Sequence, residues 1–404
     1  MPFVVASLPG RHHQNPYIAR FYEALSAHGI ELYEEPEMTL AWGARHFDRV
    51  DAIHFHWPEY IWRENIGPPA SASSLRERLR QHVPGAWRVL GALHTKREAQ
   101  ASRQTRQRQA RGRSVDFFAN YLETARNAGV SIFWTAHNLE SHEGWDDIDE
   151  RGFAKLAEQA DLVICHSLNA RDDFLARYGG AAKVVVMPHG NYDGVYPAPR
   201  ARTEVLLELG LNPNRPTVGC VGAIRGYKGI DLAVDAVRLL DGQIQMLCAG
   251  KPRKMTGFLE SFGQSGPGPG IVLVPRMLSD QEFADYSAAC DLLLLPYTRI
   301  TGSGALLAAL TFGRAVVTSD LPYFREVVKG DSVAARLIPV GDRAALARAI
   351  VDMLEIDASS RAAAARALAD EYAWPRVVTP VVDAIKSIDA RRARKLCGGG
   401  EVVS

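Results

Sequence analysis

The sequence predicts an α/β fold made of two Rossmann-like domains. Along most of its 404 residues, short apolar runs alternate with amphipathic stretches. This alternation is typical of parallel sheets that are covered by helices on both faces. The Pro-rich stretch Tyr196–Arg200 interrupts the alternation once, and the same pattern then resumes. We therefore expect an N-terminal domain over residues 1–198, a C-terminal domain over 199–375, and a last helix with a flexible tail over 376–404.

Apolar runs and amphipathic stretches predict the individual elements of the first domain. The expected strands are Phe3–Leu8, Glu31–Tyr33, Ala52–His56, Ser131–Ala136, Leu162–Cys165 and Lys183–Met187. The expected helices between them are Ala19–Ala27, Phe117–Ala128 and Phe153–Ala160.

The second domain repeats this pattern. Its expected strands are Thr217–Gly222, Ile244–Ala249, Ile271–Val274, Leu292–Leu295 and Ala315–Thr318, and its expected helices are Ile230–Leu240, Asp280–Ala289 and Ala305–Phe312. From Ser359 the chain is helical in pattern, with a break at Trp374-Pro375. We expect these C-terminal helices to pack back on the N-terminal domain.

The charge balance excludes a uniformly basic nucleic-acid-binding protein, because the chain has 47 Lys and Arg and 46 Asp and Glu. The segment 76–113 differs, with 11 Lys and Arg and only two Glu. Its apolar residues recur at four-residue spacing, at Leu75, Leu79, Val83 and Trp87, and Pro84-Gly85 interrupts them. The segment is either a helix that lies on an anionic membrane or a solvated helical excursion, with an RNA-binding arm the least favoured alternative.

Cysteines and apolar runs predict a cytoplasmic location. The five cysteines form no Cys-x-x-Cys pair, and four of them lie in or beside apolar runs, which favours reduced core residues. No apolar run approaches the ~20 residues that span a bilayer. The N-terminus enters a strand pattern directly, unlike a signal peptide. Peripheral attachment to the inner face of the membrane would follow if segment 76–113 binds lipid.

Two loops have the chemistry of phosphate-binding sites. Gly222–Gly229 follows a predicted strand, opens a helix and carries Arg225 and Lys228. Glycines allow a phosphate to approach the backbone, and a helix N-terminus offers free N–H groups. The segment Pro296–Gly304 repeats the arrangement, and its anion-binding residues would be Thr301, Gly302, Ser303 and Gly304. Two such loops in one domain indicate a diphosphate, and neither is a Walker motif.

These motifs resemble the C-terminal half of GT-B glycosyltransferases. They read Gly-x-Ile-Arg-x-Tyr-Lys-Gly, strand-Pro-Tyr and Ser-Gly-x-Leu-Leu-x-Ala-Leu-x-Phe-Gly-Arg-x-Val-Val. The N-terminal half agrees, with Asn15-Pro16-Tyr17, His54-Phe55-His56-Trp57-Pro58, Trp134-Thr135-Ala136-His137-Asn138-Leu139 and Pro188-His189-Gly190-Asn191-Tyr192. The resemblance is to the family 4-like branch, and within it to the xanthan- and acetan-type β-mannosyltransferases that use GDP-mannose.

The resemblance implies a metal-independent enzyme without a cofactor, whose substrate is a nucleoside diphosphate sugar. Arg225 and Lys228 would hold the donor diphosphate, and Ser303 and Gly304 would cap it. Many family 4 enzymes carry two glutamates that align here to Ile300 and Ala308. The β-mannosyltransferase branch also lacks that pair, so we expect mannose transfer from GDP-mannose, with inversion, to a carbohydrate or lipid-linked glycan.

Polar loops of the first domain would face the cleft between the two domains. In the loop after the first strand, Gly10 would approach the donor, and His12, His13 and Asn15 would bind the acceptor. After the strand Ser131–Ala136, the candidates for the base that accepts the hydroxyl proton are His137, Glu140 and Glu143. His189 would hydrogen-bond the donor phosphate or sugar.

Two other groups are expected to be structural. The acids of Asp146-Asp147-Ile148-Asp149 precede a helix, where carboxylates are favoured, so we expect no metal site there. His54 and His56 are expected to pack in the core or beside the acceptor.

Three alternative functions remain open from the sequence. One is a UDP-sugar-dependent glycosyltransferase with another acceptor. The second is a non-catalytic GT-B scaffold, and the third is a sugar-nucleotide epimerase, which shares the two-domain architecture.

Overall fold

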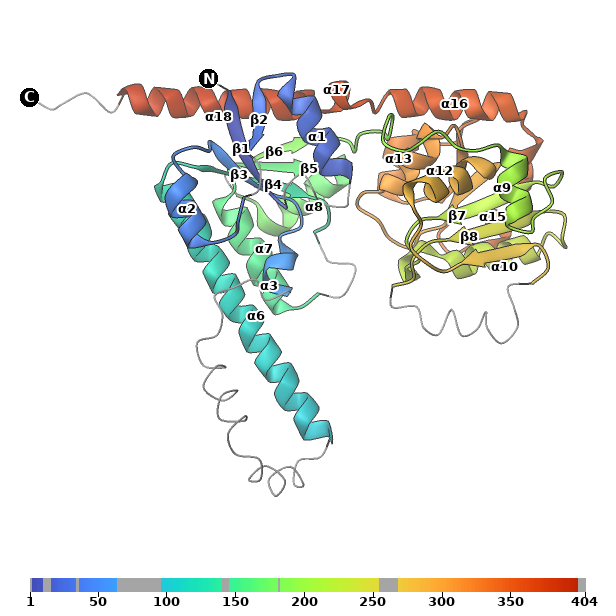
Figure 1. The fold of residues 1–404 in the computed structure, drawn as a ribbon, viewed down its shortest axis with the longest axis horizontal. Helices are drawn as coiled ribbons and strands as arrows, with labels where there is room; N and C mark the ends of the chain where they lie inside the picture. Colours follow the sequence, from blue (N-terminus) through green and yellow to red (C-terminus); the bar gives the residue numbers. More distant parts are fainter. Residues whose placement is uncertain are drawn as a thin grey trace, which may run out of the picture. The chain divides into compact units, whose positions relative to one another are not determined.

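A computed structural model describes residues 2–9, 16–33, 36–63, 96–139, 145–180, 182–253 and 268–398. The chain forms two compact units, each built around a six-stranded sheet (Figure 1). The first unit comprises Met1–Ile164, Asp173–Val185 and Asp383–Ser404, and the second comprises Cys165–Asp172 and Val186–Val382. The long second segment of the second unit begins at Val186, slightly before the Pro-rich stretch at which the sequence pattern predicted a boundary.

The sheet of the first unit has the strand order β2-β1-β3-β4-β5-β6. Its strands are β1 (Phe3–Leu8), β2 (Ile30–Tyr33), β3 (Ala52–Phe55), β4 (Ser131–Ala136), β5 (Leu162–Cys165) and β6 (Lys183–Val186). Its helices are α1 (Pro16–Ser26), α2 (Leu40–His46), α3 (Glu59–Arg63), α6 (Lys96–Asn127), α7 (Asp147–Gln159) and α8 (Leu168–Tyr178). All residues of β3, β4 and β5 are buried, as expected for parallel strands covered on both faces.

The sheet of the second unit has the order β12-β11-β10-β7-β8-β9. Its strands are β7 (Thr217–Val221), β8 (Gln245–Ala249), β9 (Ile271–Val274), β10 (Leu292–Leu295), β11 (Ala315–Ser319) and β12 (Ala335–Ile338). Its helices are α9 (Arg202–Glu208), η1 (Gly226–Lys228), α10 (Ile230–Arg238), α12 (Asp280–Ala289), α13 (Gly304–Thr311), α14 (Pro322–Val328), α15 (Arg343–Glu355), α16 (Ala358–Asp370) and α17 (Trp374–Val377). The pattern of apolar runs did not predict β12, a four-residue edge strand that contains Arg336.

The C-terminal helix returns to the first unit, as the sequence predicted. This helix, α18 (Thr379–Gly398), buries Ile385 and Ile388. Its Arg392 donates a 2.7 Å hydrogen bond to the carbonyl oxygen of Asp51, and its guanidinium lies 6.0 Å from the centroid of the Phe3 ring. These contacts fix the end of the chain beside β1 and β3.

Helix α6 is longer than the sequence indicated. It runs for 32 residues and includes the basic residues from Lys96 to Arg113. Figure 1 shows that its first turns extend away from the other elements of the first unit. The part of the basic segment before Lys96, including the apolar residues at four-residue spacing, lies outside the described residues.

Cysteine burial agrees with the sequence. Cys165, Cys220, Cys248 and Cys290 are buried and form no disulfide. Across the described ranges, no helix is long and apolar enough to cross a membrane.

Candidate active site

The loop after β7 depends on glycines at points of close backbone approach. Gly222 has φ +111°, and a Cβ added to Gly250 would overlap the Gly222 carbonyl oxygen. Gly229 has φ +62°, and a Cβ there would overlap the carbonyl oxygen of Pro296. A side chain at Gly250 or Gly229 would push the ends of β7, β8 and β10 apart, and one at Gly222 would strain the backbone.

The two predicted phosphate loops lie against each other. The N–H of Thr298 donates a 2.8 Å hydrogen bond to the carbonyl oxygen of Tyr227. The rings of Tyr227 and Tyr297 pack edge to face, with centroids 5.6 Å apart. The structure therefore brings Arg225 and Lys228 next to the segment that leads into α13.

Lys228 is half-buried at this junction. Its Nζ lies 5.6 Å from the centroid of the Tyr297 ring. Burial, together with the nearby Arg225 guanidinium, lowers the pKa of Lys228 to about 8, and Cys220 opposes the shift. Between the described residues, no ion pair joins Lys228 or Arg225 to a carboxylate. Two neighbouring cations that repel each other are a favourable site for an anion.

The second loop presents a helix N-terminus. Ser303 is the N-cap of α13, and its hydroxyl accepts a 3.2 Å hydrogen bond from the N–H of Leu306. The hydroxyl is thus used within the helix, and the N–H groups of Gly304 and Ala305 belong to the first turn, where the helix leaves donors for a ligand. Gly304 is required here, because a Cβ would overlap the hydroxyl of Tyr192. Thr301 and Gly302 precede this turn and are half-buried.

His189 lies beside the same helix start. Its Nδ1 is 2.7 Å from the carbonyl oxygen of Gly190, which can only accept, so Nδ1 carries the hydrogen. Burial, together with the nearby His166, lowers the pKa of His189 to about 3, and the hydrogen bond to Gly190 opposes the shift. The ring is therefore neutral, and its Nε2, on the side of Gly304, is an acceptor. This tautomer suits a sugar hydroxyl better than a phosphate oxygen.

The segment around His189 is held by α16 and α17. Gly190 packs against the indole of Trp374, with no room for a Cβ. Trp374 Nε1 donates a 2.8 Å hydrogen bond to the Asn191 carbonyl oxygen, and Asn191 N–H donates to the Tyr372 carbonyl oxygen. These contacts fix the backbone that positions His189.

In the first unit, His137 follows β4 and joins an aromatic cluster. Its Nε2 lies 3.2 Å from Nδ1 of His56. The Trp57 indole stacks on its ring at 4.4 Å and 13°, and Tyr17 meets it edge-on at 4.8 Å. The candidate base is thus half-buried and held from several sides.

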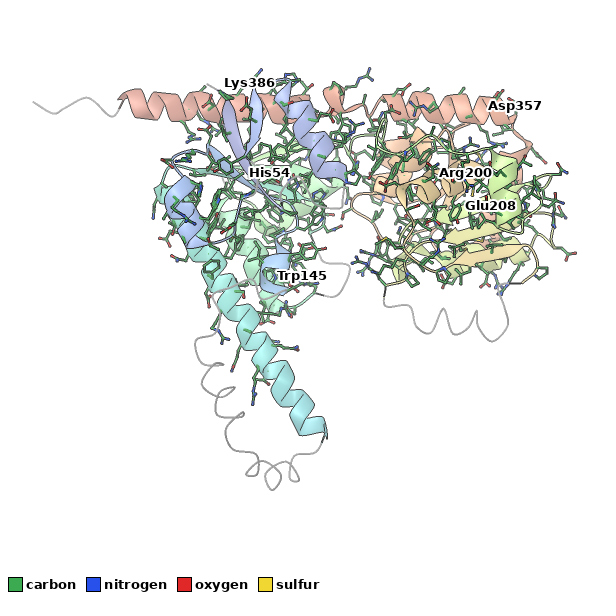
Figure 2. The ribbon with its side chains drawn as sticks, in the orientation of Figure 1. His54, Trp145, Arg200, Glu208, Asp357 and Lys386 are labelled. Atoms are coloured by element: carbon green, nitrogen blue, oxygen red, sulfur yellow. The ribbon has the colours of Figure 1, made fainter. Side chains whose placement is uncertain are left out.

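His54 has a structural role in this cluster. It lies on β3 among the strands of the first unit (Figure 2). Its Nδ1 is 2.7 Å from the Tyr22 hydroxyl and its Nε2 is 2.8 Å from the Thr135 hydroxyl, so both ring nitrogens are used. Burial lowers the pKa of His54 to about 3. A buried, neutral, doubly hydrogen-bonded histidine agrees with the predicted packing role.

Several predicted residues lie outside the described residues. They are Gly10, His12, His13, Asn15, Glu140 and Glu143. Arg177 contacts the described residues on either side of positions 140–144. Its Nη1 donates to the Leu139 carbonyl oxygen at 3.3 Å, and its guanidinium lies 4.7 Å from the ring centroid of Trp145.

The acids at the start of α7 serve the helix and nearby arginines. Asp146 and Asp149 form a reciprocal capping box. Arg111 contacts Asp146 at 2.6 Å and Asp149 at 2.9 Å, and Arg63 contacts Asp149 at 2.7 Å. These contacts confirm the structural interpretation of the acids and show that Arg111, from the basic segment, is half-buried against α7.

Sequence reasoning missed a third loop at this edge of the second sheet. After β8, Gly250-Lys251-Pro252-Arg253 pairs with the first loop, since Ile224 N–H donates to the Lys251 carbonyl oxygen at 3.0 Å and Arg253 N–H donates to that of Ile224 at 2.9 Å. Both cations are exposed. A glycine followed by two cations directly after a predicted strand was the available signal.

Comparisons with known proteins agree with this geometry. Residues 215–356 match the family glycosyl transferases group 1. The chain is 31% identical over 219 residues to the alpha-maltose-1-phosphate synthase of Mycolicibacterium smegmatis, covering 50% of this chain and 56% of that protein. It is 24% identical over 315 residues to a GDP-mannose:glycolipid 4-beta-D-mannosyltransferase of Xanthomonas campestris, covering 75% of this chain and 69% of that protein.

Solved structures share the fold. The sucrose-phosphate synthase of Thermosynechococcus elongatus has a TM-score of 0.62 at 17% identity, covering 97% of this chain and all of that one. Anabaena HepE in complex with UDP and glucose has a TM-score of 0.65 at 14% identity, covering 96% of this chain and all of that one. The chain thus has the GT-B fold predicted from its motifs, and its residues 215–356 match the glycosyl transferases group 1 family.

Proposed function

We propose that this protein transfers a sugar from a nucleoside diphosphate donor to a carbohydrate or lipid-linked glycan. The observation that carries the proposal is the position of Arg225 and Lys228 where the loops after β7 and β10 meet. Breaking the bond between the sugar and the diphosphate places negative charge on the leaving group. Fixed cations and the helix start at Ser303–Gly304 stabilise that charge without a metal ion.

The donor in this proposal is GDP-mannose, and transfer proceeds with inversion. Support comes from the named activity of the Xanthomonas relative and from the motifs shared with its branch. Neutral His189 would accept a hydrogen bond from a hydroxyl of the donor sugar, while Gly10, Thr301 and Gly302 would contact the diphosphate. A UDP-sugar donor is the second candidate, supported by the fold shared with HepE, whose structure contains UDP.

The acceptor in this proposal binds the first unit. His12, His13 and Asn15 would contact its sugars, and its attacking hydroxyl would give its proton to a base. His137, Glu140 and Glu143 are the candidates for that base.

A lipid-linked acceptor gives the basic segment a role at an anionic membrane. Arg106 and Arg113 are exposed on α6, whereas Arg108 and Arg111 pair with Asp147 and Asp146. Exposed arginines attract anionic lipid, and each contributes about 1 kcal/mol near such a surface.

Vesicle flotation tests this role. The double variant Arg106→Gln/Arg113→Gln should float less with phosphatidylserine vesicles than the wild type does. The matched control, Arg343→Gln/Arg348→Gln on exposed positions of α15, should float like the wild type. Equal flotation of all three proteins would exclude a contribution of α6 to membrane binding.

Calorimetric titration with GDP, UDP, ADP and dTDP tests the central proposal. Micromolar binding of GDP alone supports the mannosyl donor, and preference for UDP replaces it by a UDP-sugar. Binding of none favours a non-catalytic scaffold. Turnover of a nucleotide sugar without any acceptor would instead indicate an epimerase, because transfer needs an acceptor and epimerisation does not.

A further inference from the structure

His56 and His137 are joined in a way that bears on how the candidate base works. They come from the ends of neighbouring strands, β3 and β4, and His56 is buried while His137 is half-buried. The distance of 3.2 Å between His56 Nδ1 and His137 Nε2 means that one nitrogen carries a hydrogen and the other accepts it. The bond therefore fixes the tautomer of both rings.

The direction of this bond decides whether His137 is able to act as a base. If His56 donated, the lone pair of His137 Nε2 would be occupied and its Nδ1 would carry the ring hydrogen. If His137 Nε2–H donates to His56, the lone pair of His137 lies on Nδ1. A proton taken up at Nδ1 then forms an imidazolium whose Nε2–H keeps, and strengthens, its bond to neutral His56.

The Trp57 ring supports the charged form of His137. The two rings are nearly parallel, at 13° and 4.4 Å, so an imidazolium would lie on the π face of the indole. Such cation–π contacts contribute roughly 0.5–1 kcal/mol when exposed and more when desolvated. Tyr17, perpendicular to the His137 ring, holds it against Trp57.

We propose that His56 and Trp57 are positioning residues that set His137 Nδ1 as the proton acceptor of the transfer reaction. This inference rests on the proposed function. In the step, the acceptor oxygen forms its bond to the anomeric carbon, and the bond from that carbon to the diphosphate oxygen breaks with its electron pair. The hydroxyl proton passes to His137 Nδ1, and the diphosphate leaves with the electron pair and the negative charge.

Two substitutions of His56 separate hydrogen bonding from packing. His56→Leu removes the acceptor, and we expect kcat to fall 10- to 100-fold with the donor KM within about twofold. His56→Asn places an amide oxygen near the former Nδ1 position and should restore kcat to within about fivefold of the wild type. The control His46→Asn, on α2 and outside this cluster, should match the wild type.

The pH profile reports the same interaction. His56→Leu should shift the acidic limb of kcat/KM to lower pH by about one unit, because the imidazolium of His137 loses its acceptor. Among the described residues, Tyr22 and His54 are titratable groups that contact the pair. Burial raises the pKa of Tyr22 and lowers the pKa of His54 to about 3, so both stay neutral across this range. Tyr17 is the third such group, and it is present in every variant.

Nitrogen-15 NMR of the wild-type protein shows which ring nitrogen of His137 carries the hydrogen, so this test does not require a folded His56 variant. The variant His137→Gln is used only to assign the His137 signals. We expect His137 as the Nε2–H tautomer, and an Nδ1–H tautomer would overturn the inference. Wild-type kcat and pH profile in His56→Leu would overturn it while leaving sugar transfer intact. Absence of transfer by the wild type with GDP-mannose and with UDP-sugars would instead overturn the proposed function.

Discussion

Lys228 is a cation whose surroundings disfavour its charge. Burial and the neighbouring Arg225 lower its pKa to about 8, which means that they destabilise its charged form. The negative charge of a bound diphosphate would offset this destabilisation. Lys228→Ala should weaken binding of the preferred nucleoside diphosphate by 10- to 100-fold, about 1.5–3 kcal/mol for a hydrogen bond to a charged group. Calorimetry measures this change.

The fold should tolerate this substitution. The melting temperature of Lys228→Ala should stay within a few degrees of the wild type, because the substitution removes a half-buried charge that the neighbouring Arg225 repels. Lys386→Ala, on an exposed position of α18 (Figure 2), should leave both affinity and stability unchanged. Wild-type affinity in Lys228→Ala would contradict the diphosphate assignment.

The same residue predicts a pH dependence of donor binding. Below pH 8 the Lys228 side chain is charged in the free protein, and above pH 8 it is neutral. Between pH 7.5 and 9.5 the affinity should therefore fall by about tenfold, and binding near pH 8 should take up protons. Titrations in buffers of different ionisation enthalpy measure this uptake. In Lys228→Arg, whose guanidinium stays charged, a tenfold fall over this range would contradict the assignment.

At the scale of elements, α6 and α7 are joined by an arginine–aspartate network. Asp149 is buried and accepts from Trp62 Nε1 at 2.8 Å, in addition to its contacts with Arg63 and Arg111. Removing one partner would leave a buried charge without compensation. This network explains why α7 carries acids in its first turn and why α6 continues its basic sequence beside it.

Two helical glycines in this region predict opposite effects on stability. A Cβ on Gly112 in α6 would meet only the end of the Arg151 side chain, at 3.7 Å, whereas on Gly152 in α7 it would lie 2.8 Å from the Trp62 ring. Gly112→Ala should stabilise by about 0.5–1 kcal/mol through helix propensity. Gly152→Ala should destabilise by roughly 1–3 kcal/mol through overpacking.

Urea unfolding of the two variants tests this contrast, and each variant serves as the control for the other. Equal changes in the free energy of unfolding would show that the packing of Trp62 against α7 does not disfavour a side chain at position 152.

At the scale of the whole molecule, buried neutral histidines predict sensitivity to acid. Burial lowers the pKa values of His54 and His189 to about 3 and that of His166 to about 4, from 6.5. Between pH 6.5 and 4 the unfolded chain therefore binds protons that the folded chain does not. The free energy of unfolding should fall in this window, by up to about 2 kcal/mol per histidine at pH 5.

Urea unfolding at pH 7.5, 6 and 5 measures this loss. His166→Gln should reduce the pH dependence in the second unit, and His28→Gln, at an exposed position of the first unit, should not. A free energy of unfolding that stays constant from pH 7.5 to 5 would contradict the burial of neutral histidines.

Hydrophobic patterning determined much of the fold. The expected bounds of β1, β4, β5, β9, β10 and α12 agree with the structure. The strands among them are short, apolar and flanked by polar turns, so local patterning is sufficient to locate them. The start of α6 was missed because polar and charged residues dominate it, and β12 was missed because it is a four-residue edge strand that contains Arg336; tertiary packing decides the conformation of both.

Local motifs likewise located the two loops after β7 and β10, since glycines, cations and a helix start lie close together in the sequence. Only the tertiary structure joined His56 to His137, which are 81 positions apart, and placed Gly250 against Gly222. It also decided the tautomer of His189 and the lowered pKa of Lys228. The lowered pKa of Lys228 depends mainly on burial, and the His189 tautomer depends on how the backbone folds at Gly190, and local sequence determines neither.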